Sequence, residues 1–276
     1  MTVCHTIDKI SYESIDDYCK YLLHSGGKNG CGLAPKTVSD ILSIIRNILK
    51  YAMQKGIYVS CNIEAIQIKQ HHKNMRIFSK KEQNQLCEYL LSNIESCNIG
   101  ILVCLFTGLR IGEICALHWE DVSYSEQTIS VRHTLQRIQT HSDNGPKTKV
   151  IITTPKSPCS IRVIPLPNEL CDLLMLYQKV STGFLLTNSD SKFIEPRTMQ
   201  NNFKKVLKSI GIIDANFHCL RHTFATRCIE VGFDVKSLSE ILGHATVNIT
   251  MNRYVHPSLE IKQQHMQKLS NLLAVK

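Results

Sequence analysis

The feature that most constrains the fold is a short apolar run that a glycine brings to an end. Residues 99–106 carry no charged side chain, but a membrane span needs ~18 or more apolar residues. We therefore predict a helix buried in a packed core. Gly108 breaks that helix and residues 111–117 begin another. This places Arg110 at the N-terminal mouth of the second helix, where backbone amides favour an anion.

Helical periodicity predicts two amphipathic helices upstream of this run. Apolar residues recur at three- and four-residue steps over 14–24 and again over 35–56. The pair Ser79-x-x-Glu82 has the pattern of a capping box and predicts the start of a further helix.

A group of strand patterns follows the buried helix and its restart. Alternating apolar residues predict strands over 128–135, 150–153 and 161–164, with a turn over 154–159 between the last two. Helices are predicted after them, over about 167–180, 197–210, 218–231, 235–242, 247–253 and 259–273. The order is helices, strands, helices. We therefore predict a mainly α fold with a small antiparallel β-sheet, an α+β architecture.

A polar and basic segment over 67–75 is our candidate linker. It predicts a helical domain over 1–72 and a second domain over 73–276, although an ordinary loop inside one domain would have the same composition. The pair His71-His72 is most simply part of this polar segment.

Composition narrows the class of partner. The net charge is +9 with a pI of about 8.9, which suits an anionic partner such as nucleic acid and equally suits a plain basic protein. The 12 cysteines contain no Cys-x-x-Cys pair, so a zinc ribbon is not expected. No export signal or membrane span is evident, and we expect free thiols in a reducing cytoplasm.

Two arginines have the chemistry needed to hold a phosphodiester. More charge gathers on the nonbridging oxygens as a nucleophile attacks, and a planar guanidinium can grip two of them. Fixed donors of this kind each lower such a barrier by a few kcal/mol. Arg110 is one candidate and Arg221 is the other.

Three histidines surround the second arginine or follow it. His218 lies three residues before Arg221, on the same face of a predicted helix, and His222 lies one turn from His218, where it joins the pair or packs beneath it. His244 follows Gly243, a natural helix end, which would project its imidazole from a loop. Imidazole can donate to a phosphate oxygen or accept a proton near neutral pH.

Tyr254 lies ten residues beyond His244 and is the candidate nucleophile. A phenol ionises near pH 10, so it needs a base or nearby positive charge, which the arginines and His218 would supply. Lys156, in the predicted turn, would act as general acid on the leaving oxygen. No carboxylate cluster for magnesium is apparent, and we expect neither metal nor cofactor.

Each of these residues alone is weak evidence. A single tyrosine near the end of a chain usually lies on the surface, and a lysine in a turn is common. The His218–His222 spacing also occurs in pairs of metal ligands, but the glutamate of a zinc-protease helix is missing here. The specificity lies in their conjunction and order.

In that order the residues resemble the tyrosine recombinase (phage integrase) family, similar to conjugative-transposon and phage integrases. The resemblance covers residues 79 to about 260. The matching segments are Thr107-Gly108-Leu109-Arg110-x-Gly112-Glu113, Thr154-Pro155-Lys156 leading to Ser160-Ile161-Arg162-x-Ile164-Pro165-Leu166, His218-x-x-Arg221-His222-Thr223-x-Ala225-Thr226, Leu242-Gly243-His244, and Tyr254.

The resemblance implies a mechanism and its residues. Tyr254 would form a 3′-phosphotyrosine and free a 5′-hydroxyl. The scissile phosphate would be clamped by Arg110 and Arg221, and Lys156 would be the general acid. His218 would be the general base or a proton relay, and His244 would bond a nonbridging oxygen.

The resemblance also implies supporting residues and an assembly. Glu113 would brace the pocket, with His222 beside it. Family members exchange strands as tetramers on DNA, through a Holliday junction and without metal or ATP. We expect double-stranded DNA at a specific site as the partner, a homotetramer on DNA and a monomer alone. The helix over 259–273 would dock on a neighbouring subunit or on its own domain.

Two features depart from the family pattern. Cys219 stands where an acid usually supports the pocket. The segment before residue 73 has room for two or three helices, whereas a core-binding domain of the SAM-like type usually has about four. We therefore expect the chain to start partway into the core-binding domain. Basic residues in and after it would neutralise DNA phosphates, unless they form a solvated face: Lys36, Arg46, Lys50, Lys55, Lys69, Lys73 and Arg76.

Three functions compete on the sequence. The first is a site-specific recombinase or integrase of a mobile genetic element. The second is a type IB topoisomerase or telomere resolvase with the same chemistry, which the length and the His244-to-Tyr254 spacing disfavour. The third is a shortened integrase that acts only as a DNA-binding accessory protein.

Overall fold

The computed structural model describes residues 6–7, 10–59, 61, 63–69, 75–140, 145–155, 158–255, 263, 266–267 and 269–270. The chain divides into two compact units, Met1–Asn74 and Met75–Lys276. Lys73, Lys156, the pair His71-His72 and most of the helix expected over 259–273 lie outside the described residues.

The first unit is built on two helices, α1 (Tyr12–Ser25) and α2 (Pro35–Gln54), as predicted. The Ser11 side chain caps the start of α1, and Pro35 occupies the first turn of α2, where its missing N–H costs nothing. Short 3₁₀ turns follow each helix, η2 (Lys28–Gly30) and η3 (Ile63–Ala65). The helices share an apolar core that includes the buried residues Ile15, Cys19, Leu22, Val38, Leu42, Leu49, Cys61 and Ile66.

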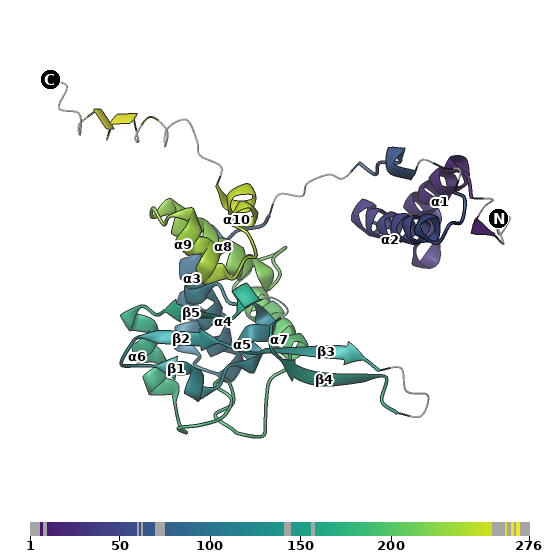
Figure 1. Ribbon diagram of the computed structural model, residues 1–276. Helices are drawn as coiled ribbons and strands as arrows, with labels where there is room; N and C mark the ends of the chain where they lie inside the picture. The colour runs from purple at the N-terminus through teal and green to yellow at the C-terminus, as the bar shows by residue number, and fades with distance from the viewer. Residues whose placement is uncertain are drawn as a thin grey trace. The chain divides into compact units, whose positions relative to one another are not determined.

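The second unit is organised around α4 (Ser96–Thr107), the buried helix predicted from its apolar run. Almost every side chain of α4 is buried, and Figure 1 shows the helix inside the unit. It packs against four other helices, α3 (Lys80–Ser92), α5 (Ile111–Ala116), α7 (Pro196–Ser209) and α8 (His218–Glu230). The predicted capping box is present at the start of α3, where Ser79 and Glu82 bond each other's backbone N–H.

The other helices of this unit also match their predicted ranges closely. They are α6 (Asn168–Tyr177), α9 (Val235–Leu242) and α10 (Val247–Tyr254). Two single 3₁₀ turns, η4 (Trp119–Asp121) and η5 (Pro158–Ser160), precede strands.

The strands form two small antiparallel sheets instead of one. The first has the order β1 (Val122–Ser123), β2 (Thr128–Val131) and β5 (Arg162–Pro165). The second is a hairpin of β3 (Thr134–Gln139) and β4 (Thr148–Thr153), which extends away from the unit in Figure 1.

Two strand predictions were wrong in detail. The expected single strand over 128–135 is interrupted at residues 132–133, and its two parts belong to different sheets. The predicted strands on either side of 154–159 do not pair with each other, because β4 pairs with β3 and β5 pairs with β2. β4 and β5 therefore belong to different sheets and do not form the expected hairpin.

The start of the second unit is attached to α8. Phe78 is fully buried, and its N–H donates to the Thr223 hydroxyl at 2.9 Å while its carbonyl accepts from the Arg227 guanidinium at 2.7 Å. These bonds fix α3 beside α8, the helix that carries three of the predicted site residues.

Cysteines and membrane segments can be assessed within the described residues. The 11 cysteines among them are free thiols. None of the described helices has both the length and the apolar content that crossing a bilayer requires.

Candidate active site

The break after α4 has the form predicted from Gly108. This glycine ends α4 in the left-handed conformation, with φ 65° and ψ 18°, which a side chain would disfavour. Arg110 is then the residue before α5. Its backbone N–H donates to Glu113 Oε2 at 2.9 Å, and its side chain donates to Glu113 Oε1 at 2.8 Å. The Arg110 side chain is 39% exposed, so it borders solvent.

Arg221 lies deeper in the unit. It is only 2% exposed, an unusual position for a charged side chain. Its guanidinium donates to the Gly108 carbonyl and to the Leu242 carbonyl, each at 2.7 Å. Burial, followed by the charge of Arg110, lowers the pKa of Arg221 to about 10, which leaves it charged at neutral pH.

The C-terminal end of α9 gathers three arginines. Carbonyl groups at a helix end lack partners within the helix and carry its negative dipole. Here Arg162 donates to Ile241 at 2.6 Å, Arg221 donates to Leu242 at 2.7 Å, and Arg110 donates to Gly243 at 3.0 Å. Three successive carbonyls thus accept hydrogen bonds from guanidinium groups of β5, of α8 and of the residue before α5.

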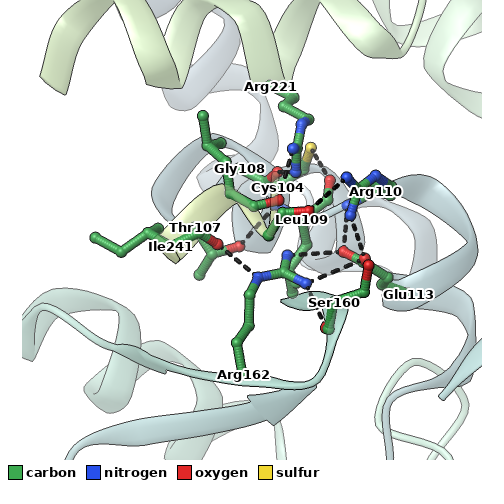
Figure 2. A network of polar contacts seen from close by, with 12 residues as sticks. Cys104, Thr107, Gly108, Leu109, Arg110, Glu113, Ser160, Arg162, Arg221 and Ile241 are labelled. Atoms are coloured by element: carbon green, nitrogen blue, oxygen red, sulfur yellow. Dashed lines mark hydrogen bonds and ion pairs between the residues drawn. The ribbon is translucent and has the colours of Figure 1, made fainter. Parts of the chain in front are cut away.

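Glu113 connects two of these arginines, as Figure 2 shows. Besides Arg110, it accepts from Arg162 Nη1 at 3.1 Å and from Arg162 Nη2 at 2.9 Å, and both side chains are buried. Burial opposes ionisation of Glu113, but the hydrogen bonds and charge of Arg162, with those of Arg110, outweigh it and lower the pKa of the carboxyl. A buried carboxylate therefore fixes the spacing of Arg110 and Arg162.

His244 follows this helix end. Gly243 turns the chain in the left-handed conformation, with φ 63° and ψ 47°. His244 Nε2 lies 3.0 Å from Arg221 Nη2, and its Nδ1 lies 2.8 Å from Thr250 Oγ1. Since an arginine only donates, Nε2 must accept, and a neutral ring then carries its proton on Nδ1 and donates to Thr250. To donate to a phosphate, His244 would have to be protonated or turned.

Tyr254 ends α10 inside this cluster. It is 6% exposed, and its ring is parallel to the His244 ring at a centroid distance of 6.4 Å. Its hydroxyl lies 2.9 Å from His222 Nδ1. The exposed His218 ring meets the His222 ring edge-on at 4.3 Å. The structure therefore brings together Arg110, Glu113, His218, Arg221, His222, His244 and Tyr254.

The positive charge of the site shifts its titrations. Neighbouring groups remove part of the solvent around each ring, and together with the charge of Arg221 this lowers the pKa of His218 to about 4 and that of His244 to about 3. Burial raises the pKa of Tyr254 above its ordinary value, although Arg221, Arg253 and Arg110 act in the opposite direction. Without DNA the site therefore holds neutral histidines and a neutral phenol between charged arginines.

The basic residues predicted to contact DNA are not among the side chains of the active-site cluster. Lys36 pairs with Asp40 on the surface of α2, and Lys50 is exposed on the same helix. The guanidinium of Arg46 donates to the Ile66 carbonyl, and that of Arg76 pairs with Glu82 of the α3 capping box. Arg46 and Arg76 thus have roles within the protein, and DNA contact by these residues stays a prediction.

Two site residues carried no assigned role in the sequence. Arg162 stood within a family segment, but only the fold reveals that it bonds Glu113 and the end of α9. Thr250 is fully buried and contacts His244, yet a threonine inside a helix gives no local signal of this.

Cys219 occupies the position where the family pattern has an acid. It is buried, and its thiol accepts from the Asn216 N–H at 3.4 Å and donates to the Asn216 side chain at 3.7 Å. Cys219 thus supports the loop before α8. Among the described residues, no group of three or more His, Cys, Asp or Glu side chains could hold a metal ion.

Comparison with known proteins places this arrangement in a family. The model of the phage integrase family matches residues 76–260. A tyrosine recombinase XerC-like protein from Caldanaerobacter subterraneus is 26% identical over 265 residues, covering 87% of this chain and 67% of the relative. The ICEBs1 integrase of Bacillus subtilis is 24% identical over 282 residues, covering 97% of this chain and 72% of the relative.

Solved structures share the fold. The Tn1549 transposon integrase in complex with transposon right end DNA aligns with a TM-score of 0.78 at 19% identity, over 96% of this chain and 87% of that one. A lambda integrase tetramer bound to a Holliday junction aligns with a TM-score of 0.60 at 16% identity, over 92% and 68%.

Fold and family together define the class as the tyrosine-type site-specific DNA recombinases. The chain belongs to the phage integrase family. The comparisons give no support to the topoisomerase or accessory-protein alternatives.

Proposed function

We propose that this recombinase cleaves double-stranded DNA through Tyr254, forming a 3′-phosphotyrosine and releasing a 5′-hydroxyl. The observation that carries the proposal is the position of the tyrosine. It lies buried against His222 and His244, and His244 in turn bonds Arg221. A nucleophile and the charges that would stabilise a phosphorane are therefore held in one cluster.

Each remaining residue has a role in the proposed step. Arg110 and Arg221 clamp the nonbridging oxygens, and Glu113 with Arg162 keeps Arg110 in place. His244 donates to a phosphate oxygen once a bound phosphate draws Arg221 from its Nε2, and His218 takes part in proton transfer. Lys156 protonates the leaving 5′ oxygen. The positive side chains take the place of a metal.

The assembly and its setting are part of the same proposal. We expect a homotetramer that joins two duplexes and resolves a Holliday junction, in line with the lambda integrase tetramer. The first unit would act as a core DNA-binding domain of the SAM-like type. The proposed division of the chain near residue 73 is supported by its two compact units, Met1–Asn74 and Met75–Lys276. The cytoplasm, where thiols stay reduced, suits the free cysteines.

A covalent-capture experiment tests this function. A pool of nicked duplexes with randomised cores is incubated with the protein, and covalent adducts are isolated and sequenced to reveal a site. We expect adducts with the wild type in the presence of a chelator. Arg110→Ala and Arg221→Ala should reduce adduct by at least about 10²-fold while much of the DNA binding remains. Adduct that the chelator abolishes would contradict the mechanism.

A further inference from the structure

The tyrosine nucleophile must lose a proton, and the structure limits where that proton can go. The Tyr254 hydroxyl is buried, 2.9 Å from His222 Nδ1. The positive charge of Arg253 also acts on this side chain, in the direction that lowers its pKa. A guanidinium has no lone pair to offer, so Arg253 can stabilise a phenolate but cannot accept the proton.

The other two histidines are less suitable acceptors. Both ring nitrogens of His244 are engaged, Nε2 by Arg221 and Nδ1 by Thr250. His218 meets His222 ring to ring at 4.3 Å, and it is exposed while the tyrosine is buried. Among the described histidines, His222 is the one within hydrogen-bond distance of the hydroxyl.

We propose that His222 is the general base of strand cleavage and accepts the Tyr254 proton directly at Nδ1, while His218 passes the charge to solvent. The inference rests on the proposed function and assigns to His222 the role that the family resemblance gave to His218. For this the neutral His222 ring carries its proton on Nε2, which leaves Nδ1 as the acceptor.

The step balances as a single displacement. The phenolic proton moves to His222 Nδ1, and the released electron pair forms the bond from the tyrosine oxygen to phosphorus. The bond from phosphorus to the 5′ oxygen breaks, and that oxygen takes a proton from the general acid. The His222 imidazolium then gives up its Nε2 proton toward His218 and solvent.

Electrostatics agree with this role. Partial burial, followed by the charges of His218, Arg253 and Arg221, lowers the pKa of His222 to about 4, so the ring is neutral and able to accept at neutral pH. The titratable and charged groups around His222 are therefore His218 and Arg221 of α8 and Arg253 and Tyr254 of α10. A bound phosphodiester brings negative charge that offsets the arginines and stabilises the imidazolium formed in the step.

Two substitutions at this position separate holding the tyrosine from deprotonating it. His222→Gln can still accept a hydrogen bond but cannot take a proton, whereas His222→Ala leaves space for an added base. With the duplex recovered by covalent capture, we expect both variants to form adduct at least about 10²-fold more slowly than wild type near pH 7. DNA binding and unfolding midpoints should stay near the wild-type values for His222→Gln.

The pH dependence and chemical rescue give readouts that a structural role would not move. The wild-type rate should change little between about pH 6 and 8, while the His222→Gln rate should rise about tenfold per pH unit as free phenolate is required. Added imidazole should accelerate His222→Ala and leave His218→Ala unaffected. A wild-type rate and profile in His222→Gln, or rescue of His218→Ala instead, would overturn the proposal.

A bridging 5′-phosphorothiolate substrate separates this proposal from the proposed function. Its thiolate leaving group needs no general acid, so the loss in His222→Gln should persist on it. Recovery of His222→Gln on this substrate would assign the residue to leaving-group protonation and contradict the inference. If wild type forms no adduct on any duplex, the proposed function itself fails, which is a different result from activity that does not depend on His222.

Discussion

Glu113 is a carboxylate buried between two guanidinium groups. It accepts four hydrogen bonds, one from the Arg110 backbone, one from the Arg110 side chain and two from Arg162. Removing one member of such a buried group leaves the other charges uncompensated, which costs more than the intact group contributes. We therefore expect this carboxylate to contribute both to stability and to the position of Arg110.

We expect Glu113→Gln to lower the free energy of unfolding by about 3 kcal/mol at neutral pH. Because the folded-state pKa of Glu113 is lowered, its ionised form stabilises the native protein above the ordinary carboxyl pKa of about 4.3. That contribution is lost as the pH falls through the lowered pKa. Urea unfolding of wild type and variant should therefore converge toward acid pH.

Glu195→Gln is the matched control. Glu195 pairs with Arg137 at a partly exposed position, with 46% of the arginine and 30% of the glutamate side chain exposed. Its loss should cost less than about 1 kcal/mol. Equal losses for the two variants would contradict the account of Glu113.

The C-terminal end of α9 is a second point where backbone and arginine side chains depend on each other. Three carbonyls left unpaired by the helix accept from three arginines, and the glycine after them turns the chain toward His244. A Cβ at Gly243 would lie 3.0 Å from Arg162 Nη1 in addition to requiring the left-handed conformation. The backbone and the arginine cluster are therefore coupled at one residue.

Gly243→Ala should destabilise the protein by about 1–2 kcal/mol through strain alone and reduce adduct formation by more than tenfold. Gly211→Ala is a matched control, because Gly211 has φ 71° with nothing within 4 Å of an added Cβ. It should show the strain without the loss of adduct. Thermal unfolding and adduct kinetics of both variants provide the comparison, and equal adduct yields would refute the coupling.

Short sequence patterns predicted most helices and strands. The pairing of strands and the contacts between side chains could be seen only in the folded structure. The Ser79 capping box, the break at Gly108 and the helix end at Gly243 are determined by neighbouring residues, and their ranges were confirmed. Strand partners depend on distant residues, so β4 was placed beside the wrong strand. Arg162 and Thr250 contact site residues through tertiary packing, which no spacing in the sequence reveals.

Tyr254 lies in the site formed by the arginines and histidines of its own chain. Its ring is stacked on His244 and its hydroxyl contacts His222 of the same unit. This favours cleavage in cis, with each subunit using its own tyrosine on the phosphate that its own arginines hold.

Mixing two inactive variants tests this arrangement. Tyr254→Phe keeps the arginines and Arg221→Ala keeps the tyrosine, so a mixture restores activity only if the tyrosine acts in trans. We expect adduct in the mixture to stay at the level of the separate variants, measured on the captured duplex. Adduct well above that level would show that a tyrosine can enter the site of a neighbouring subunit.

Peptide mapping of the adduct identifies the residue that forms the covalent bond to DNA. After digestion of protein and DNA, mass spectrometry locates the nucleotide-bearing residue. We predict a nucleotide on the peptide containing Tyr254 and none in a Tyr254→Phe digest. A nucleotide attached to any other residue, or adduct that persists in Tyr254→Phe, would contradict the account.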